Sequence, residues 1–512
     1  MGIIVRQSIK GTVVNYLGSF IGFIMTFFIM IKYLTPAEVG LTRVLLDVAL
    51  LLAGIASLGT NASIIRFYPY FKNQEKRDHG FFFWTLLLPL VGFLIVLACY
   101  LIFKENIIGF FIKESPLFVE YSNFVIPLAF FLMYIAVFET NSNVLMRIVI
   151  PKFIREVVIR LMLVCVYLCY AFNVFTQHQF IIAFCAVYGV ALLLNIFYMF
   201  SLGKVSLKPD IHYIDKGLAK NIGNYTLFLV IASLASTITP MINTIFISGK
   251  MGLDSNGIFA VATYIAAIIE IPYRSLGAIT QPQISHAIKD NDAMRANTLC
   301  KSVSFHQLLI GSLIFFFIWI NIDAIFDVIP NGDFYKAGKW AVCIIGLSRL
   351  FNSAFSVGTT VLNFSKYYYY SLIFSFGLTV LAIFLNLKLI PVWGILGAAM
   401  ATLISYLVYY LFLLGLSYIK LKISPFSKKQ LTVVLLVAIL FLLNYLWNIS
   451  LSPLILKINA NQLFLTILDR GLCSILLAGI VGVVVYKFKF SDEIHGLIEM
   501  GLDKTVRRRK GK

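Results

Sequence analysis

A succession of long apolar stretches constrains this chain more than any other feature. Fourteen of them approach the roughly 20 residues that an α-helix needs to cross a bilayer. The chain of 512 residues is 60% hydrophobic and 13% charged, whereas a soluble domain has about 25% charged residues. We therefore expect an all-α polytopic membrane protein. The predicted spans are 11–34, 41–65, 80–103, 119–145, 154–173, 180–202, 222–248, 256–280, 302–323, 338–364, 369–390, 393–416, 430–449 and 468–487.

Lysine and arginine are distributed unevenly between the loops. If the N-terminus is cytoplasmic, 28 of the 42 fall on cytoplasmic segments and eight on the opposite face. Cytoplasmic loops of membrane proteins carry such an excess. Both termini are therefore predicted to be cytoplasmic, and the loop bias explains most of the net charge of +19 without a nucleic-acid partner. The terminal RRRKGK is expected to contact anionic lipids.

A weak internal repeat relates two parts of the chain. Tyr33–Asp47 and Lys250–Tyr264 are each a short polar turn that opens an apolar helix, with Gly40 and Gly257 in matching places. Parallel halves related by an axis along the membrane normal are one route to alternating access, although chance similarity between apolar segments is the alternative explanation. The repeat predicts an N-terminal six-helix lobe over 1–203, a second lobe over 204–419, two further helices within 420–490 and a basic tail over 491–512.

Two short motifs resemble those of a known superfamily. Leu34, Pro36, Glu38 and Gly40 form an L-x-P-x-E-x-G turn, and Ile390–Thr402 reads IPVWGILGAAMAT. Both are similar to the polysaccharide-biosynthesis branch of the multidrug/oligosaccharidyl-lipid/polysaccharide exporter superfamily. The resemblance implies two six-helix lobes around a central cavity. It also implies an O-antigen-type flippase that moves undecaprenyl-pyrophosphate-linked oligosaccharide outward across a bacterial cytoplasmic membrane.

The first predicted helix departs from two other branches of that superfamily. Lipid II flippases typically carry an arginine there, and drug exporters commonly carry a carboxylate for cation coupling. Neither residue type occurs between Lys10 and Lys32. Gly18 and Gly22 instead form a GxxxG pattern, which is typical of close helix approach.

The stretch Arg147–Arg160 places charge between two apolar runs. It holds four cations and a single acid, Glu156. A charge at the centre of a membrane helix costs roughly 2.5–3.5 kcal/mol on insertion scales. These cations therefore need water or an anion beside them.

Arginines within or next to predicted spans are the candidate ligands for a pyrophosphate headgroup, because the guanidinium fork pairs with phosphate oxygens and stays charged. The candidates are Arg43, Arg66, Arg147, Arg155, Arg160, Arg274 and Arg349. Three of them have an acid four residues away, on the same helix face, and could simply be neutralised. The pairs are Arg43 with Asp47, Glu156 with Arg160, and Glu270 with Arg274.

Arg66, Arg147 and Arg349 have no acid within four residues, which makes them the better candidates for a cavity. For Arg66 and Arg147 the alternative is snorkelling of the side chain to the membrane interface.

Acids within the spans are candidates for ion coupling. They are Asp47, Glu139 and Glu270. Carboxylates at membrane depth are often functional, and a hydrogen-bonded structural role is the alternative. Glu139 has no basic residue at helical spacing before Arg147.

These features favour a flippase for a lipid-linked oligosaccharide that works by alternating access. A cation-coupled drug antiporter, a lipid II flippase and a membrane scaffold for polysaccharide assembly are the alternatives. We expect no enzymatic activity, metal or cofactor, since no nucleophile–base pair, CxxC motif or nucleotide-binding loop occurs. The expected partners are the lipid-linked substrate and membrane lipids, with a polymerase and glycosyltransferases as possible partners.

Overall fold

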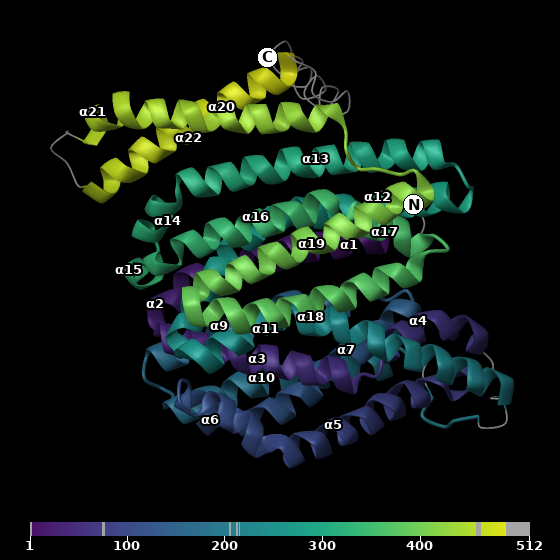
Figure 1. Ribbon diagram of the computed structural model, residues 1–512. Coiled ribbons are helices and arrows are strands. Elements are labelled where there is room, and N and C mark those ends of the chain that lie inside the picture. Colours follow the sequence, from purple (N-terminus) through teal and green to yellow (C-terminus); the bar gives the residue numbers. More distant parts are fainter. Residues whose placement is uncertain are drawn as a thin grey trace, which may run out of the picture. The chain divides into compact units, whose positions relative to one another are not determined.

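The computed structural model describes residues 3–73, 77–203, 206–210, 213, 216–456 and 462–487, and these form helices joined by short turns (Figure 1). The predicted basic tail 491–512 lies outside the described residues. The α-helices of the first part are α1 (Ile3–Ile24), α2 (Ile31–Tyr33), α3 (Pro36–Ala56), α4 (Thr60–Phe71), α5 (Phe81–Phe111), α6 (Pro116–Tyr121), α7 (Val125–Val144), α8 (Val149–Phe153), α9 (Ile159–Ala171) and α10 (Gln177–Ser201). They are followed by α11 (Lys216–Ala267), α12 (Ile271–Lys289), α13 (Ala293–Ile320), α14 (Ile322–Val328), α15 (Gly332–Tyr335), α16 (Lys339–Phe355), α17 (Val357–Phe364), α18 (Tyr368–Trp393), α19 (Ile395–Leu421), α20 (Lys428–Ser450), α21 (Ser452–Leu456) and α22 (Gln462–Lys487).

Helices long and apolar enough to cross a membrane number 11 among the described residues, or up to 12 if one bent pair forms a single span. The protein is thus an all-α multi-pass membrane protein, as predicted. The 11 are Val13–Tyr33, Pro36–Phe71, Asp78–Phe111, Pro116–Val144, Gln177–Ser201, Ile238–Tyr273, Ala293–Ile320, Tyr368–Trp393, Ile395–Leu421, Lys428–Ile455 and Gln462–Lys487. The bent pair is Gly332–Phe355 with Val357–Phe364, at 41°.

The expected number of fourteen is not confirmed, and two regions account for the difference. The expected span 154–173 belongs to a helical run that contains a π-helical segment, η4 (Ile154–Val158), and several charges. The expected spans 222–248 and 256–280 both fall in α11, where Gly252 has a φ of 87° and separates two helical stretches. Most side chains over 218–237 lie outside the described part of the structure, and the span found here among the described residues is Ile238–Tyr273.

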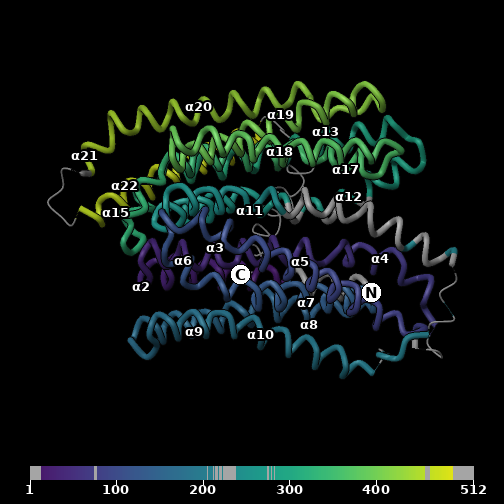
Figure 2. The backbone as a smooth tube through the Cα atoms, turned by 60° about the horizontal axis from the view of Figure 1, so that its bottom comes forward, coloured from purple at the N-terminus to yellow at the C-terminus, as the bar shows by residue number. Residues whose placement is uncertain are grey.

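The chain divides into two compact units. Unit 1 comprises Met1–Thr263, Ile329–Ile344 and Tyr370–Tyr409. Within it, α7 packs between α3 and α10, and α1 contacts both α8 and η4 (Figure 2). The lobe boundaries at 203 and 419 remain a prediction.

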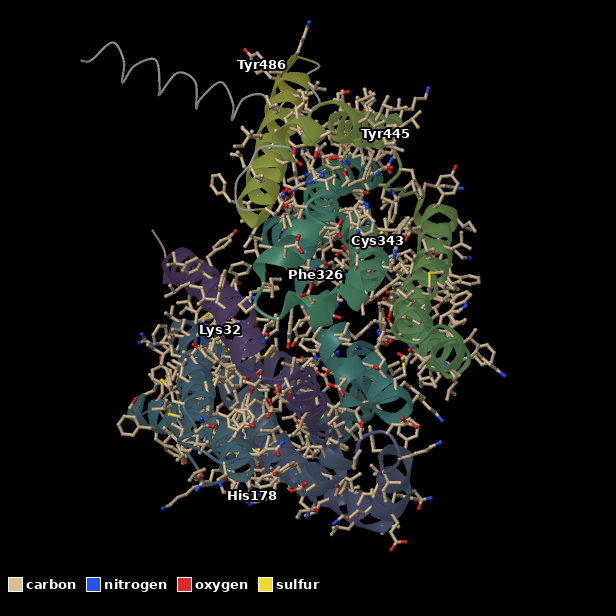
Figure 3. All side chains as sticks on the ribbon, turned by 90° about the vertical axis from the view of Figure 1, so that its left-hand side faces the viewer. Lys32, His178, Phe326, Cys343, Tyr445 and Tyr486 are labelled. Atoms are coloured by element: carbon tan, nitrogen blue, oxygen red, sulfur yellow. The ribbon has the colours of Figure 1, made fainter. Side chains whose placement is uncertain are left out.

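Unit 2 comprises Tyr264–Val328, Ile345–Tyr369 and Tyr410–Lys512. Its α13 packs against α12 and α20, and α20 contacts α22. The buried face between these helices is apolar, with Phe316, Leu440 and Leu477 in one cluster. Large aromatic side chains remain exposed on the outer faces of α20 and α22, among them Tyr445 and Tyr486 (Figure 3). Such exposed apolar faces are expected where helices contact lipid rather than water.

The L-x-P-x-E-x-G turn has a local physical explanation. Thr35 is the N-cap of α3, and its side chain accepts a hydrogen bond from the backbone N–H of Glu38, whose carboxylate in turn accepts from the N–H of Thr35. This reciprocal capping box fixes the start of the helix, and Pro36 occupies the first turn, where its missing N–H has no consequence. The hydroxyl of Tyr170 on α9 also donates to Glu38. The motif therefore sets a helix start and ties it to a neighbouring helix.

Candidate functional site

Four charged residues on α7, η4 and α9 form one connected group in unit 1, which we call the Arg155 network. Nη1 of Arg155 lies 2.8 Å from Oε2 of Glu139, and its Nε lies 3.2 Å from Oε1 of Glu156. Glu156 also pairs with Arg160, at 2.9 Å between Oε2 and Nη2. The pairing of Glu156 with Arg160 confirms the spacing argument. Arg155 supplies the basic partner that Glu139 lacks along its own helix.

Exposure differs among the members of the Arg155 network. The side chain of Arg155 is 46% exposed and that of Glu139 is 14% exposed. The guanidinium of Arg155 has five N–H groups, and the two nitrogens that bond the carboxylates do not use all of them. It can therefore be oriented by its two acids and still donate to an additional acceptor.

Helix α1 packs against Glu156 and Arg160 of the Arg155 network. A Cβ built on Gly22 would lie 3.2 Å from Nε, Cζ and Nη1 of Arg160, and one built on Gly18 would lie 2.7 Å from Cβ of Glu156. The two glycines of the GxxxG pattern thus make room beside α1 for the guanidinium of Arg160 and for the Cβ and backbone oxygen of Glu156. Close approach was predicted from this pattern, but its partner was not.

A second pair in unit 1 joins Arg43 and Asp47 on α3. Nε of Arg43 lies 2.8 Å from Oδ2 of Asp47, and the carboxylate is buried. The i,i+4 spacing had predicted this pairing.

A third group, which we call the Glu270 network, lies in unit 2. Nη1 of Arg349 donates to both carboxylate oxygens of Glu270, at 3.0 and 3.1 Å. Nδ2 of Asn352 donates to Oε1 of Glu270 at 3.0 Å, and the Tyr410 hydroxyl donates to Oδ1 of Asn352 at 2.6 Å. Arg349 has no nearby acid in the sequence, yet it is paired with one in the fold. Glu270, expected to pair with Arg274, binds Arg349; the side chain of Arg274 lies outside the described part of the structure.

Arg66 and Arg147 occupy different surroundings from the networks. Both are exposed. The Arg66 guanidinium lies 5.8 Å from the centre of the Phe67 ring on α4, and Arg147 lies in the break between α7 and α8. Arg147 thus lies at a helix end, where long basic side chains readily snorkel, whereas Arg66 lies in the middle of α4.

Asn352 and Tyr410 belong to the Glu270 network but were not singled out in the sequence. Asn352 lies three residues after Arg349, so its position on the same helix face was a usable signal. Tyr410 had no such signal, because only tertiary folding brings it to Asn352. Within the described residues there is no group of three His, Cys, Asp or Glu side chains that could hold a metal ion.

The helices define a multi-pass membrane protein whose fold is similar to that of solved transporters of the multidrug/oligosaccharidyl-lipid/polysaccharide exporter superfamily. A lipid II flippase, MurJ, in an inward closed conformation has a TM-score of 0.69 and 13% identity, covering 93% of this chain and 98% of that one. A multidrug resistance MATE family transporter in an inward-facing conformation has a TM-score of 0.60 and 15% identity, covering 82% and 98%. These identities support likeness of fold alone.

Sequence comparison then identifies the family. The model of the polysaccharide biosynthesis protein family matches residues 4–288, more than half of the chain, which therefore belongs to that family. An uncharacterized membrane protein of Methanocaldococcus jannaschii, MJ1068, is 22% identical over 478 residues, covering 87% of this chain and 92% of that protein. The resemblance seen in the two short motifs is thereby confirmed at the level of the family.

Proposed function

We propose that this protein is a flippase that moves polyprenyl-pyrophosphate-linked oligosaccharide across a cytoplasmic membrane, for surface polysaccharide such as O-antigen, by alternating access. The observation that carries the proposal is the pairing of each carboxylate considered for ion coupling. Asp47, Glu139 and Glu270 all lie within hydrogen-bonding distance of an arginine. An acid held this way is poorly suited to bind a cationic drug, whereas its arginine can still meet an anion.

The exposed parts of these arginines could donate hydrogen bonds to the phosphate oxygens of such a substrate. Arg155 and Arg349 are 46% and 30% exposed, and each uses only part of its guanidinium on carboxylates. A pyrophosphate carries several acceptor oxygens, and charge-assisted bonds from arginine are about twice as strong as neutral ones. The polyprenyl tail would stay in lipid while the headgroup passes these cations.

Reconstitution tests the proposal. Purified protein in proteoliposomes is given a fluorescent polyprenyl-pyrophosphate oligosaccharide, and its appearance in the outer leaflet is followed. We expect Arg155→Gln and Arg349→Gln to reduce flipping strongly, with Arg155→Lys intermediate, since lysine keeps the charge but loses the fork. Each variant is first checked for monodispersity in detergent.

Arg470→Gln is the matched control. Arg470 is also a helical arginine in contact with a buried acid, Asp469 at 3.3 Å, and it donates to Asn448. It lies on α22, among the extra helices, so flipping should be retained. An antiporter would keep drug efflux in Arg155→Gln and lose it in Glu139→Gln, and a scaffold would tolerate all of these changes.

Lipid II is the second candidate substrate, and one contact favours it. The guanidinium of Arg160 lies beside Gly22 of α1, so the first helix has an arginine next to it although it contains none between Lys10 and Lys32. Offering lipid II and a polyprenyl-pyrophosphate oligosaccharide to the same proteoliposomes distinguishes the two. A preference for lipid II would overturn the oligosaccharide assignment. Glycosyltransferases and a polymerase, which would make and consume the lipid-linked oligosaccharide, are proposed partners.

A further inference from the structure

Two glycines from the two copies of the repeat contact each other's turns reciprocally in unit 1. A Cβ built on Gly40 would overlap the backbone carbonyl of Leu253, whose carbon atom would lie 2.8 Å away. A Cβ built on Gly257 would overlap the backbone carbonyl of Pro36, whose carbon atom would also lie 2.8 Å away. Gly40 and Gly257 are 217 residues apart, and so are Pro36 and Leu253. The contact is therefore symmetric: each glycine packs against the backbone carbonyl of the residue four positions before the other glycine.

Hydrogen bonds on both sides repeat this symmetry. The hydroxyl of Ser115 donates to the carbonyl oxygen of Ser248 at 2.6 Å. Nδ2 of Asn331 donates to the carbonyl oxygen of Ile31 at 3.1 Å. Ser248 and Ile31 are also 217 residues apart, and each donor directly precedes a short helix, α6 or α15. The repeat seen in the sequence thus corresponds to an interface between its two copies.

The interface lies at one end of unit 1. Helices α2, α6 and α15 gather toward the left in Figures 1 and 2, whereas α4 lies toward the right. In the predicted orientation, Lys32, Lys113 and Lys336 at this end face away from the cytoplasm. Ser115 and Ser248 have no exposed surface, so this end is closed around them.

We propose that the reciprocal contact of Gly40 and Gly257 is the outer closure of the transport path, and that its opening requires these two backbone segments to separate. The proposal rests on the alternating access proposed above. The glycines meet carbonyl groups rather than charges, so separation exposes backbone without breaking an ion pair. A single added methyl group would prevent full closure, because a backbone carbonyl cannot rotate away as a flexible side chain can.

Thiol accessibility tests the closure without any transported lipid. Ser115→Cys is introduced after replacement of the seven native cysteines, and labelling by a membrane-impermeant maleimide added outside the cell is timed. We expect Ser115→Cys to be protected when both glycines are present. Adding Gly40→Ala or Gly257→Ala should accelerate labelling about tenfold, since an added methyl group overpacks the contact and disfavours the closed state.

Gly109→Ala is the matched control, because no other group lies within 4 Å of a Cβ at that position on α5, and its labelling should equal that of the parent. Equal labelling in all variants, or acceleration only with reagent on the cytoplasmic side, would overturn the proposal.

A second measurement covers the case in which the alanine variants do not fold. Ser115→Cys and Ser248→Cys are combined with both glycines intact and treated with a short thiol cross-linker. We expect rapid cross-linking and reversible arrest of flipping; absence of cross-linking contradicts the closure. Accessibility and cross-linking do not depend on the lipid, so they can succeed even if the proposed substrate is wrong.

Discussion

The Arg155 and Glu270 networks use the same chemistry in two different surroundings. The first is built from residues close in sequence, and its central arginine is 46% exposed. The second joins the 3₁₀-helix η6 (Ile268–Glu270), α16 and α19, and its carboxylate is only 6% exposed while its arginine is 30% exposed. Breaking a buried ion pair leaves an uncompensated charge, whereas exposed pairs contribute little to stability. We infer that the Glu270 network contributes more than the Arg155 network to the stability of the folded state, and that the Arg155 network is the more accessible of the two to a ligand.

The largest expected effect is on the Glu270 network. Arg349→Ala removes the guanidinium that donates to both oxygens of the buried Glu270 carboxylate, and it should lower the free energy of unfolding by about 3–5 kcal/mol. Thermal unfolding in detergent measures the change. Glu270→Gln combined with Arg349→Ala should recover part of the loss, because the negative charge of the buried carboxylate is then gone. Equal destabilisation in the single and double variants would remove the distinction between the networks.

A smaller effect is expected where α1 covers the Arg155 network. Gly18→Ala places a methyl group 2.8 Å from the backbone oxygen of Glu156, and should destabilise by about 1–3 kcal/mol. Gly377→Ala is the control, since no neighbouring atom lies within 4 Å of a Cβ there. If the two variants unfold at the same temperature, α1 does not pack against the network as described.

The smallest effect on stability is expected for Arg155→Gln. Exposed ion pairs contribute roughly 0.2–1 kcal/mol and weaken with salt. The unfolding temperature should therefore change little while lipid flipping falls strongly. A large loss of stability would mean that any loss of flipping in Arg155→Gln reflects misfolding, and it would weaken the proposed role of Arg155 in substrate binding.

How much of this arrangement the sequence could predict depends on the distance between partners along the chain. Arg43 with Asp47 and Glu156 with Arg160 were predicted because helical spacing sets them on one face. The pair of Glu139 and Arg155 crosses from one helix to another, so no local rule could find it. The same holds for Arg349 and Glu270, which lie 79 positions apart.

For the fold as well, local patterns were predictable and contacts between distant segments were not. The capping box at Thr35 and the matching positions of Gly40 and Gly257 were visible as local patterns. Their mutual contact depends on how two distant segments pack, which a repeat cannot specify by itself. The fourteen predicted spans are not confirmed by the 11 or 12 found among the described residues, and the charge near Arg155 is one local reason for the difference.

The π-helical segment η4 (Ile154–Val158) has a consequence for alignments of this chain with its relatives. A π-turn accommodates an extra residue within an otherwise regular helix. Deleting one residue there would restore α-helical geometry, and the residues on either side would keep their faces. In a regular α-helix the same deletion would rotate everything after it by about 100°. Relatives that have a one-residue gap in this segment should therefore keep the contact between Gly22 and Arg160, and a deletion scan should find η4 more tolerant than α9.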